Sequence, residues 1–98
     1  MSLFKITGGN GFHMEFANGW TVSVQFGPGN YCDNYNERIG RDEAKCAERG
    51  SSDAECAYWG PNGDMQPFES GDTVEGHMSA DAVLTLINKV AAMPKKEA

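Results

Sequence analysis

The sequence predicts an α+β fold: an antiparallel sheet, built from a three-stranded N-terminal meander and a second hairpin, with a C-terminal helix packed on one face. Apolar and polar residues alternate with a period of two on both sides of Asn18 and Gly19, which is typical of a β-hairpin. Between Ser79 and Pro94 the period becomes that of a helix with one apolar stripe. Because a sheet face and a helix stripe both need an apolar partner, we expect them to cover each other.

The register of the first hairpin follows from which residues must share a face. A two-residue loop of Asn18 and Gly19 would place Phe16 opposite Thr21 and would mix apolar with polar residues on each face. A three-residue loop, 17–19, separates the two kinds of residue and puts Gly19 in the left-handed conformation that glycine adopts without steric cost. The pairs predicted are Phe16 with Trp20, Met14 with Val22, and Phe12 with Val24.

A further strand precedes this hairpin and completes the meander. The glycine-rich turn at residues 8–11 predicts that Ile6 lies opposite Phe12 and that Phe4 lies opposite Met14. The polar residues then fall on the other face, where one cross-strand row contains Lys5, His13 and Ser23. Such a row has the residue types for acid–base or nucleophilic chemistry, but we interpret it as the solvated side of a single-layer sheet.

The segment after the meander has weaker patterns. Residues 27–30 (GPGN) are expected to end the strand, and residues 31–38 have no period and are expected to form a loop. Residues 41–49 have a helix-favouring composition, and Gly50 is placed to cap a short helix there.

Two short segments predict the second hairpin. Residues 54–59 have the composition of a strand, and residues 61–64 (PNGD) have that of a turn. We expect this turn to lead into a strand at residues 65–68.

The C-terminal helix has clear start and stop signals. Ser79 is a suitable N-cap, Asp81 lies in the first turn where the helix dipole favours an anion, and Pro94 prevents continuation. Met78 and Val83 have the spacing of a hydrophobic staple. The apolar stripe expected to face the sheet consists of Val83, Leu86, Ile87, Val90 and Ala91.

Length and composition restrict the class of protein. Ninety-eight residues predict a single domain at 1–93, with a frayed tail at 94–98. There is no apolar run long enough for a membrane span and no pattern of a secretory signal, so we expect a cytoplasmic protein that binds no membrane. A net charge of −6 disfavours nucleic-acid binding, which requires clustered Lys and Arg.

The three cysteines are an odd set without CxxC spacing. Cys32, Cys46 and Cys56 are expected to be free thiols in a reducing cytosol, and no cofactor is predicted. Two alternatives stay open: a disulfide between Cys46 and Cys56, and a zinc site that uses the thiols with His13 or His77.

Two segments are candidate binding surfaces. The loop at 30–36 has two tyrosines among Asn and Asp, a composition typical of recognition surfaces, although it also suits an ordinary polar loop. From Asp53 to Glu75 there are six acidic residues and no Lys or Arg, which favours a partner with a basic surface but also suits mere solubility. The predicted partner-binding residues are Asn30, Tyr31, Asp33, Asn34, Tyr35, Asp53, Glu55, Asp64, Glu69 and Asp72.

Three segments, residues 8–34, 59–65 and 71–83, make up about half of the chain. Together they resemble small proteins encoded by tailed bacteriophages and prophages. The resemblance implies a phage accessory protein in the bacterial host cytosol, with no catalytic residue to carry over. The predicted function is therefore that of a non-enzymatic acidic interaction protein that binds and inhibits or modulates a host protein, for example one of a defence system.

The alternative function is that of a small-ligand or nucleotide-binding protein that acts as a sponge. It would use the glycine-rich turns at 8–11, 27–29 and 61–63, with a pocket that a homo-oligomer could help to form. The first and third of these turns join strands and no Lys follows them, unlike the usual phosphate-binding loop. An enzyme is the third choice, because the sequence specifies no nucleophile–base pair and no set of metal ligands.

Overall fold

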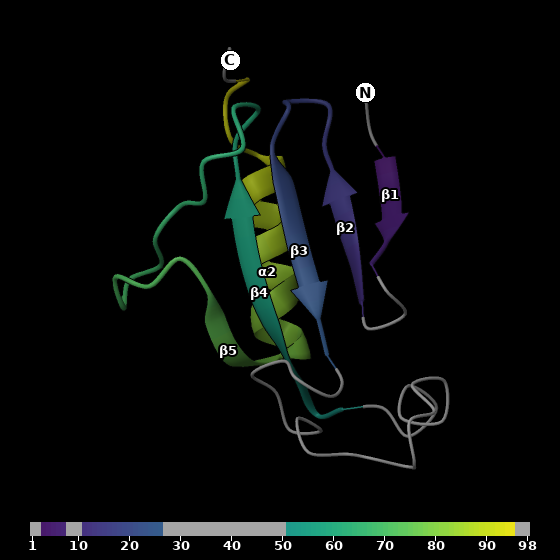
Figure 1. Ribbon diagram of the computed structural model, residues 1–98, viewed down its shortest axis with the longest axis vertical. Helices are drawn as coiled ribbons and strands as arrows, with labels where there is room; N and C mark the ends of the chain where they lie inside the picture. Colours follow the sequence, from purple (N-terminus) through teal and green to yellow (C-terminus); the bar gives the residue numbers. More distant parts are fainter. Residues whose placement is uncertain (1–2, 8–10, 27–50, 96–98) are drawn as a thin grey trace.

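The structure, a computed structural model, describes residues 3–7, 11–26 and 51–95. Within these ranges a five-stranded antiparallel sheet lies against one helix, so the predicted α+β class is confirmed (Figure 1). The strands follow one another across the sheet in chain order, and helix α2 follows the last strand directly. The elements are β1 (Leu3–Ile6), β2 (Gly11–Glu15), β3 (Thr21–Gln25), β4 (Asp53–Trp59), β5 (Glu75–Ser79) and α2 (Ala80–Ala91).

The meander has the predicted register. The loop closes with hydrogen bonds from the Phe16 N–H to the Trp20 carbonyl oxygen (2.8 Å) and from the Gly19 N–H to the Phe16 carbonyl oxygen (2.9 Å). Gly19 has a φ of +86°, which is the left-handed conformation expected for a three-residue loop. The confirmed pairs are Phe4 with Met14, Ile6 with Phe12, Phe12 with Val24, and Met14 with Val22.

The second hairpin is shorter than predicted, and β4 has a different main partner. The strand expected at 65–68 makes a single bridge, between Trp59 and Met65, together with a hydrogen bond from the Gln66 N–H to the Tyr58 carbonyl oxygen (2.9 Å). The ladder stops there, and from Cys56 back to Asp53 the same edge of β4 is occupied by another strand, which pairs Cys56 with Glu75. The fifth strand is instead β5, which was not predicted.

The helix begins at its predicted cap, where the Ser79 hydroxyl accepts a hydrogen bond from the Ala82 N–H (3.1 Å). Leu86 and Val90 are buried. The inclusion of Ala91 in the apolar stripe was wrong, because Ala91 is exposed. Met93, beyond the end of the helix, packs against the core instead.

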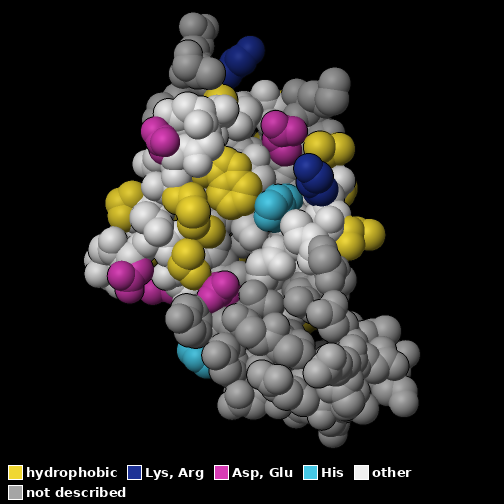
Figure 2. All heavy atoms as spheres, in the orientation of Figure 1, with side chains coloured by type: hydrophobic (Ala, Val, Ile, Leu, Met, Phe, Trp, Pro, Cys, Tyr) yellow, Lys and Arg dark blue, Asp and Glu magenta, His cyan; other side chains and the backbone are white. Residues whose placement is uncertain are grey.

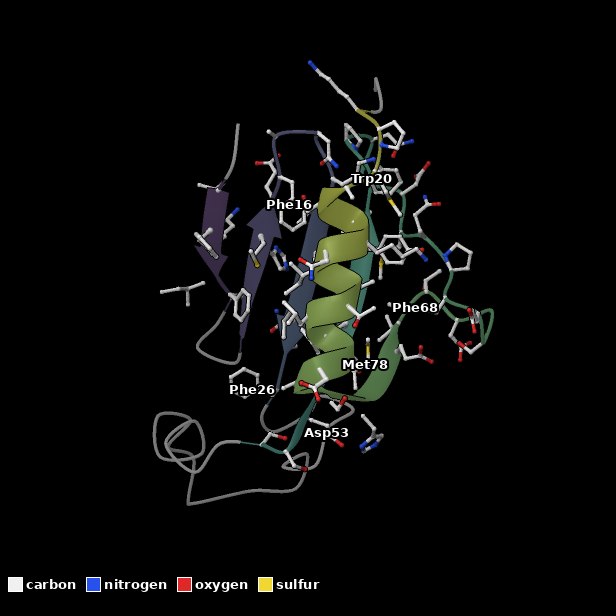
Figure 3. The ribbon with its side chains drawn as sticks, turned by 180° about the vertical axis from the view of Figure 1, so that it is seen from behind. Phe16, Trp20, Phe26, Asp53, Phe68 and Met78 are labelled. Atoms are coloured by element: carbon white, nitrogen blue, oxygen red, sulfur yellow. The ribbon has the colours of Figure 1, made fainter. Side chains whose placement is uncertain are left out.

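The core lies between α2 and the sheet. It contains Trp20, Val22, Val24, Ala54, Cys56, Tyr58, Leu86 and Val90. Among the described elements, α2 contacts β3, β4 and β5 but neither β1 nor β2 (Figures 1 and 3). The sheet is therefore two strands wider than the helix that covers it. The loop predicted at 31–38 and the helix predicted at 41–49 lie outside the described residues.

Candidate binding surfaces

The face of the sheet opposite α2, which we call the open face, is built from cross-strand rows. The first row runs from Lys5 through His13 and Ser23 to Ala57, as predicted for its first three members. The second row contains Leu3, Glu15, Thr21 and Trp59, and the bridge from Trp59 extends it to Met65. Residues from four strands and from the segment after β4 are thereby brought together.

The centre of the open face is aromatic. The His13 and Trp59 rings meet edge to face, with centroids 5.0 Å apart and planes at 83°. They come from β2 and β4, so they meet above the intervening strand β3. Ser23 and Thr21 on that strand are only 7% and 9% exposed. The prediction of a solvated polar face was therefore wrong at β3, because flanking side chains cover its short polar residues.

We call His13, Trp59 and Met65 the Trp59 surface. Met65 is 41% exposed, and His13 and Trp59 are partly exposed. Figure 2 views the open face and shows an apolar group at its centre beside a histidine and a lysine, with acidic groups towards the margins. Burial and the neighbouring Lys5 lower the pKa of His13, which favours a neutral imidazole in this contact.

The Ser23 hydroxyl is not exposed as a nucleophile would have to be. Its hydroxyl accepts a hydrogen bond from the Gln25 side-chain amide (3.2 Å), which also donates to the Thr7 hydroxyl (2.6 Å). The hydroxyl is thus buried and engaged within the sheet. The row of Lys5, His13 and Ser23 consequently supports packing and hydrogen bonding rather than an exposed reactive group.

The predicted acidic binding residues divide into two groups. Asp53 and Glu55 alternate with buried Ala54 and Cys56 on β4, so Glu55 belongs to the open face, whereas Asp53, at the first position of the strand, also borders the helix side. The other three, Asp64, Glu69 and Asp72, are exposed on the connection between β4 and β5. The structure therefore brings two of the five onto one strand and spreads the rest along that connection. The other predicted binding residues, Asn30, Tyr31, Asp33, Asn34 and Tyr35, lie outside the described residues.

The start of β4 meets a bulge in β5. Ala54 pairs with Met78 and Cys56 pairs with Glu75, so two residues of β5 oppose Glu55. One of them, His77, has a φ of +54°, an uncommon conformation for a residue other than glycine. Its Nδ1 atom lies 3.2 Å from an Asp53 carboxylate oxygen. No period-two pattern marks this strand, which explains why it was not predicted.

A second candidate surface is an apolar pocket on the helix side, with a volume of about 520 Å³. It lies between the first half of α2 and the neighbouring ends of β3, β4 and β5. Its apolar lining includes Val24, Phe26, Met78, Val83, Leu84 and Ile87. Asp53 is its one charged lining residue among those described, and none of the described glycine-turn residues lines it. The sequence signals for this pocket were the predicted staple of Met78 and Val83 and the apolar stripe that contains Val83 and Ile87.

Cys56 is a free thiol buried in the core, not at a surface. Burial and the nearby Glu55 carboxylate raise its pKa to about 12, so the thiol is neutral and poorly reactive. Cys32 and Cys46 lie outside the described residues. Within residues 3–7, 11–26 and 51–95, no cluster of three or more His, Cys, Asp or Glu side chains is arranged to hold a metal ion. No helix in those ranges is long and apolar enough to cross a membrane.

Comparisons with protein-family models, with curated proteins and with solved structures find no match to this chain. The resemblance to phage proteins stays a prediction.

Proposed function

We propose that this chain is a non-enzymatic interaction protein that binds a protein partner with a basic surface through its open face. The observation that carries the proposal is the Trp59 surface, an aromatic centre on a rigid sheet with carboxylates around it. Protein interfaces commonly have this arrangement, with an aromatic anchor at the centre and a polar rim.

The Trp59 ring is suited to anchoring because its position is already fixed. The edge-to-face contact with His13 restrains the ring, and the backbone bridge to Met65 holds the end of the strand that carries it. A restrained side chain loses little conformational entropy on binding, so more of the contact energy contributes to affinity. Met65, flexible and exposed beside it, can adapt to the shape of a partner.

The charge of the chain favours a basic partner. The net charge is −6, and Glu15 and Glu55 belong to the same face as Trp59. Long-range attraction of this kind accelerates association more than it strengthens the final complex. Together with the phage resemblance, this supports a host protein, for example a component of a defence system, as the partner in the bacterial cytosol.

The test begins with a pull-down from a bacterial lysate using the full chain, followed by binding kinetics with each purified captured protein. We expect Trp59→Ala to increase the dissociation rate at least tenfold, as for an interface anchor. Leu84→Ala is the matched control, since Leu84 is an exposed apolar residue on the helix. Rising salt is expected to slow association more than it accelerates dissociation.

The same kinetics test the predicted Tyr-rich loop. If this loop also contributes anchors, Tyr31→Ala and Tyr35→Ala will increase the dissociation rate as Trp59→Ala does. Unchanged binding by Trp59→Ala, or association that does not depend on salt, would contradict the proposed surface.

A second candidate function is small-ligand binding, and the helix-side pocket favours it. Its volume of about 520 Å³ lies within the range of small-molecule sites. Its largely apolar lining, with Asp53 as the charged member, suits an apolar ligand better than the phosphates of a nucleotide. A thermal-shift screen of nucleotides and medium-chain fatty acids separates these possibilities. Leu84→Trp, which would fill the pocket, should abolish a shift that arises there.

A further inference from the structure

The helix-side face of β1 and β2 is apolar, and none of the described helices or strands covers it. We call Phe4, Ile6, Phe12 and Met14 the β1–β2 strip. Phe4 is 74% exposed and Ile6 is 82% exposed, while Phe12 and Met14 are partly exposed. No described element lies over the strip, because α2 contacts only β3, β4 and β5. Phe12 also packs against the core, so the strip is a lateral continuation of the core beyond the helix.

We propose that a second copy of this chain covers the β1–β2 strip in a twofold-symmetric dimer. Adjacent strands lie about 4.8 Å apart, so the strip is roughly 10 Å wide. The α2 layer is about 10 Å thick, which is also the usual spacing of packed sheets. With the twofold axis approximately parallel to the strands, each strip packs on the other. The β1 strand of each subunit then lies beside the α2 helix of its partner, in the same layer.

The area available is sufficient for a weak but specific dimer. Phe4, Ile6 and the exposed parts of Phe12 and Met14 offer about 400–500 Å² per subunit, or about 800–1,000 Å² in total, which reaches the lower limit for a biological interface when the strip is fully buried. The strip contains no charged side chain, so the net charge of −6 does not place like charges in contact at its centre. A self-complementary apolar patch is what a twofold interface requires.

Packing face to face accounts for the strip better than pairing the two β1 edges. The Thr7 N–H donates to the Gly11 carbonyl oxygen (3.0 Å), so the backbone groups of Thr7 point towards β2. Successive residues of a strand direct these groups to opposite sides, so those of Phe4 and Ile6 point away from β2, to the free edge of β1. An edge pairing that uses both residues would place Lys5 directly opposite its own copy, where like charges repel. It would also leave the outer surfaces of Phe4 and Ile6 in water.

The test is the mass of the full chain in solution, measured by sedimentation equilibrium from low micromolar to near-millimolar concentration. We expect the wild type to move towards twice its monomer mass of 10.6 kDa as the concentration rises. Phe4→Glu and Ile6→Glu should each remain monomeric and folded, since both side chains are largely exposed in the single subunit. Circular dichroism verifies their folding.

Leu3→Glu is the matched control, because Leu3 is 49% exposed on the same strand but belongs to the open face. A dimer that survives Leu3→Glu and is lost with Ile6→Glu supports the proposal. A wild type that is monomeric at every concentration would overturn it. The strip would then be covered by another part of the chain or by a different protein. A dimer that resists both strip variants, or one that Leu3→Glu disrupts equally, would also overturn the proposal. The dimer leaves both Trp59 surfaces exposed, so this result is independent of the proposed partner binding.

Discussion

The side chain of Asn18 joins the first hairpin loop to the end of the helix, 72 residues later. Its Nδ2 atom donates to the carbonyl oxygens of Val90 and Met93, both at 2.9 Å, and lies 3.3 Å from that of Ala91. Its Oδ1 atom accepts from the Trp20 N–H at 3.0 Å. The last carbonyl groups of a helix lack partners within the helix, and here one loop residue supplies a donor to them.

This contact predicts that Asn18→Asp destabilises the protein more than Asn18→Ala. Asp keeps the acceptor for Trp20 but replaces the amide donor with a carboxylate facing carbonyl oxygens and the negative end of the helix dipole. We expect a loss of about 1–3 kcal/mol in the free energy of unfolding for Asn18→Asp at neutral pH. Urea denaturation of the two variants and the wild type measures it.

The penalty in Asn18→Asp should also depend on pH. The folded state disfavours the charged carboxylate, so the pKa of the introduced Asp is higher in the folded than in the unfolded protein. The penalty is complete above the folded pKa and decreases as the pH falls from there to the unfolded pKa. A difference between Asn18→Asp and Asn18→Ala that stays constant on acidification would show that the fold does not disfavour a charged carboxylate at this position, and would contradict its placement against the helix carbonyl groups.

Gly19, the next residue of the same loop, should not tolerate a side chain. Its φ is +86°, and an added Cβ atom would lie 2.8 Å from the Cγ atom of Pro61. Gly19→Val therefore combines backbone strain with a steric clash, and we expect the melting midpoint to fall by several degrees or more. Gly63→Val is an informative control: Gly63 has a φ of +83° but no atom within 4 Å of an added Cβ. Equal effects would mean that the contact with Pro61 contributes nothing.

The helix–sheet packing predicts a graded response along α2. Leu86 is 6% exposed in the core, so Leu86→Ala should cost about 2–5 kcal/mol. Ile87→Ala should cost less, because Ile87 is only partly buried, and Leu84→Ala should cost least, because Leu84 is 56% exposed. Thermal or urea denaturation of the three variants tests this order. A similar loss in all three would contradict the orientation of the helix.

Most of the sheet–helix arrangement was predictable because its alternation is long and constrained. In the meander, a slip of one residue would invert every side chain of β2 and β3, so burial alone determines the pairing. No such constraint acts on β5, where a bulge and a residue with positive φ, His77, interrupt the alternation. The predicted strand after β4 makes only one bridge, because β5 pairs with the rest of that edge of β4, from Asp53 to Cys56.

The candidate surfaces were less predictable, because they depend on which strands are neighbours. Trp59 is one residue of a short strand in the sequence, and its contact with His13 arises only because β3 lies between β2 and β4. Similarly, the exposure of Phe4 and Ile6 follows from the width of the sheet relative to α2, which no local pattern encodes. Acidic residues were evident in the sequence, but their distribution between β4 and the following connection was not.

The contact between His13 and Trp59 predicts a pH dependence of stability. The pKa of His13 is lowered from its ordinary value of 6.5, first because burial disfavours the charged ring and second because Lys5 repels it. Above the unfolded pKa the ring is neutral in both states and the stabilisation is fully present. As the pH falls below that value, the unfolded state binds the proton first, so the free energy of unfolding decreases until the lowered folded pKa is passed.

His13→Gln should remove this dependence. We expect its free energy of unfolding to fall less steeply than that of the wild type between about pH 7 and about pH 5, whatever its absolute stability. Lys5→Met should give an intermediate slope, because it removes one cause of the lowered pKa and leaves burial in place. Urea denaturation across this range measures the slopes, and His77, present in all three proteins, cancels in the comparison. Identical slopes for the wild type and His13→Gln would mean that the ring is as accessible to protons in the fold as in the unfolded chain, which would contradict its burial against Trp59.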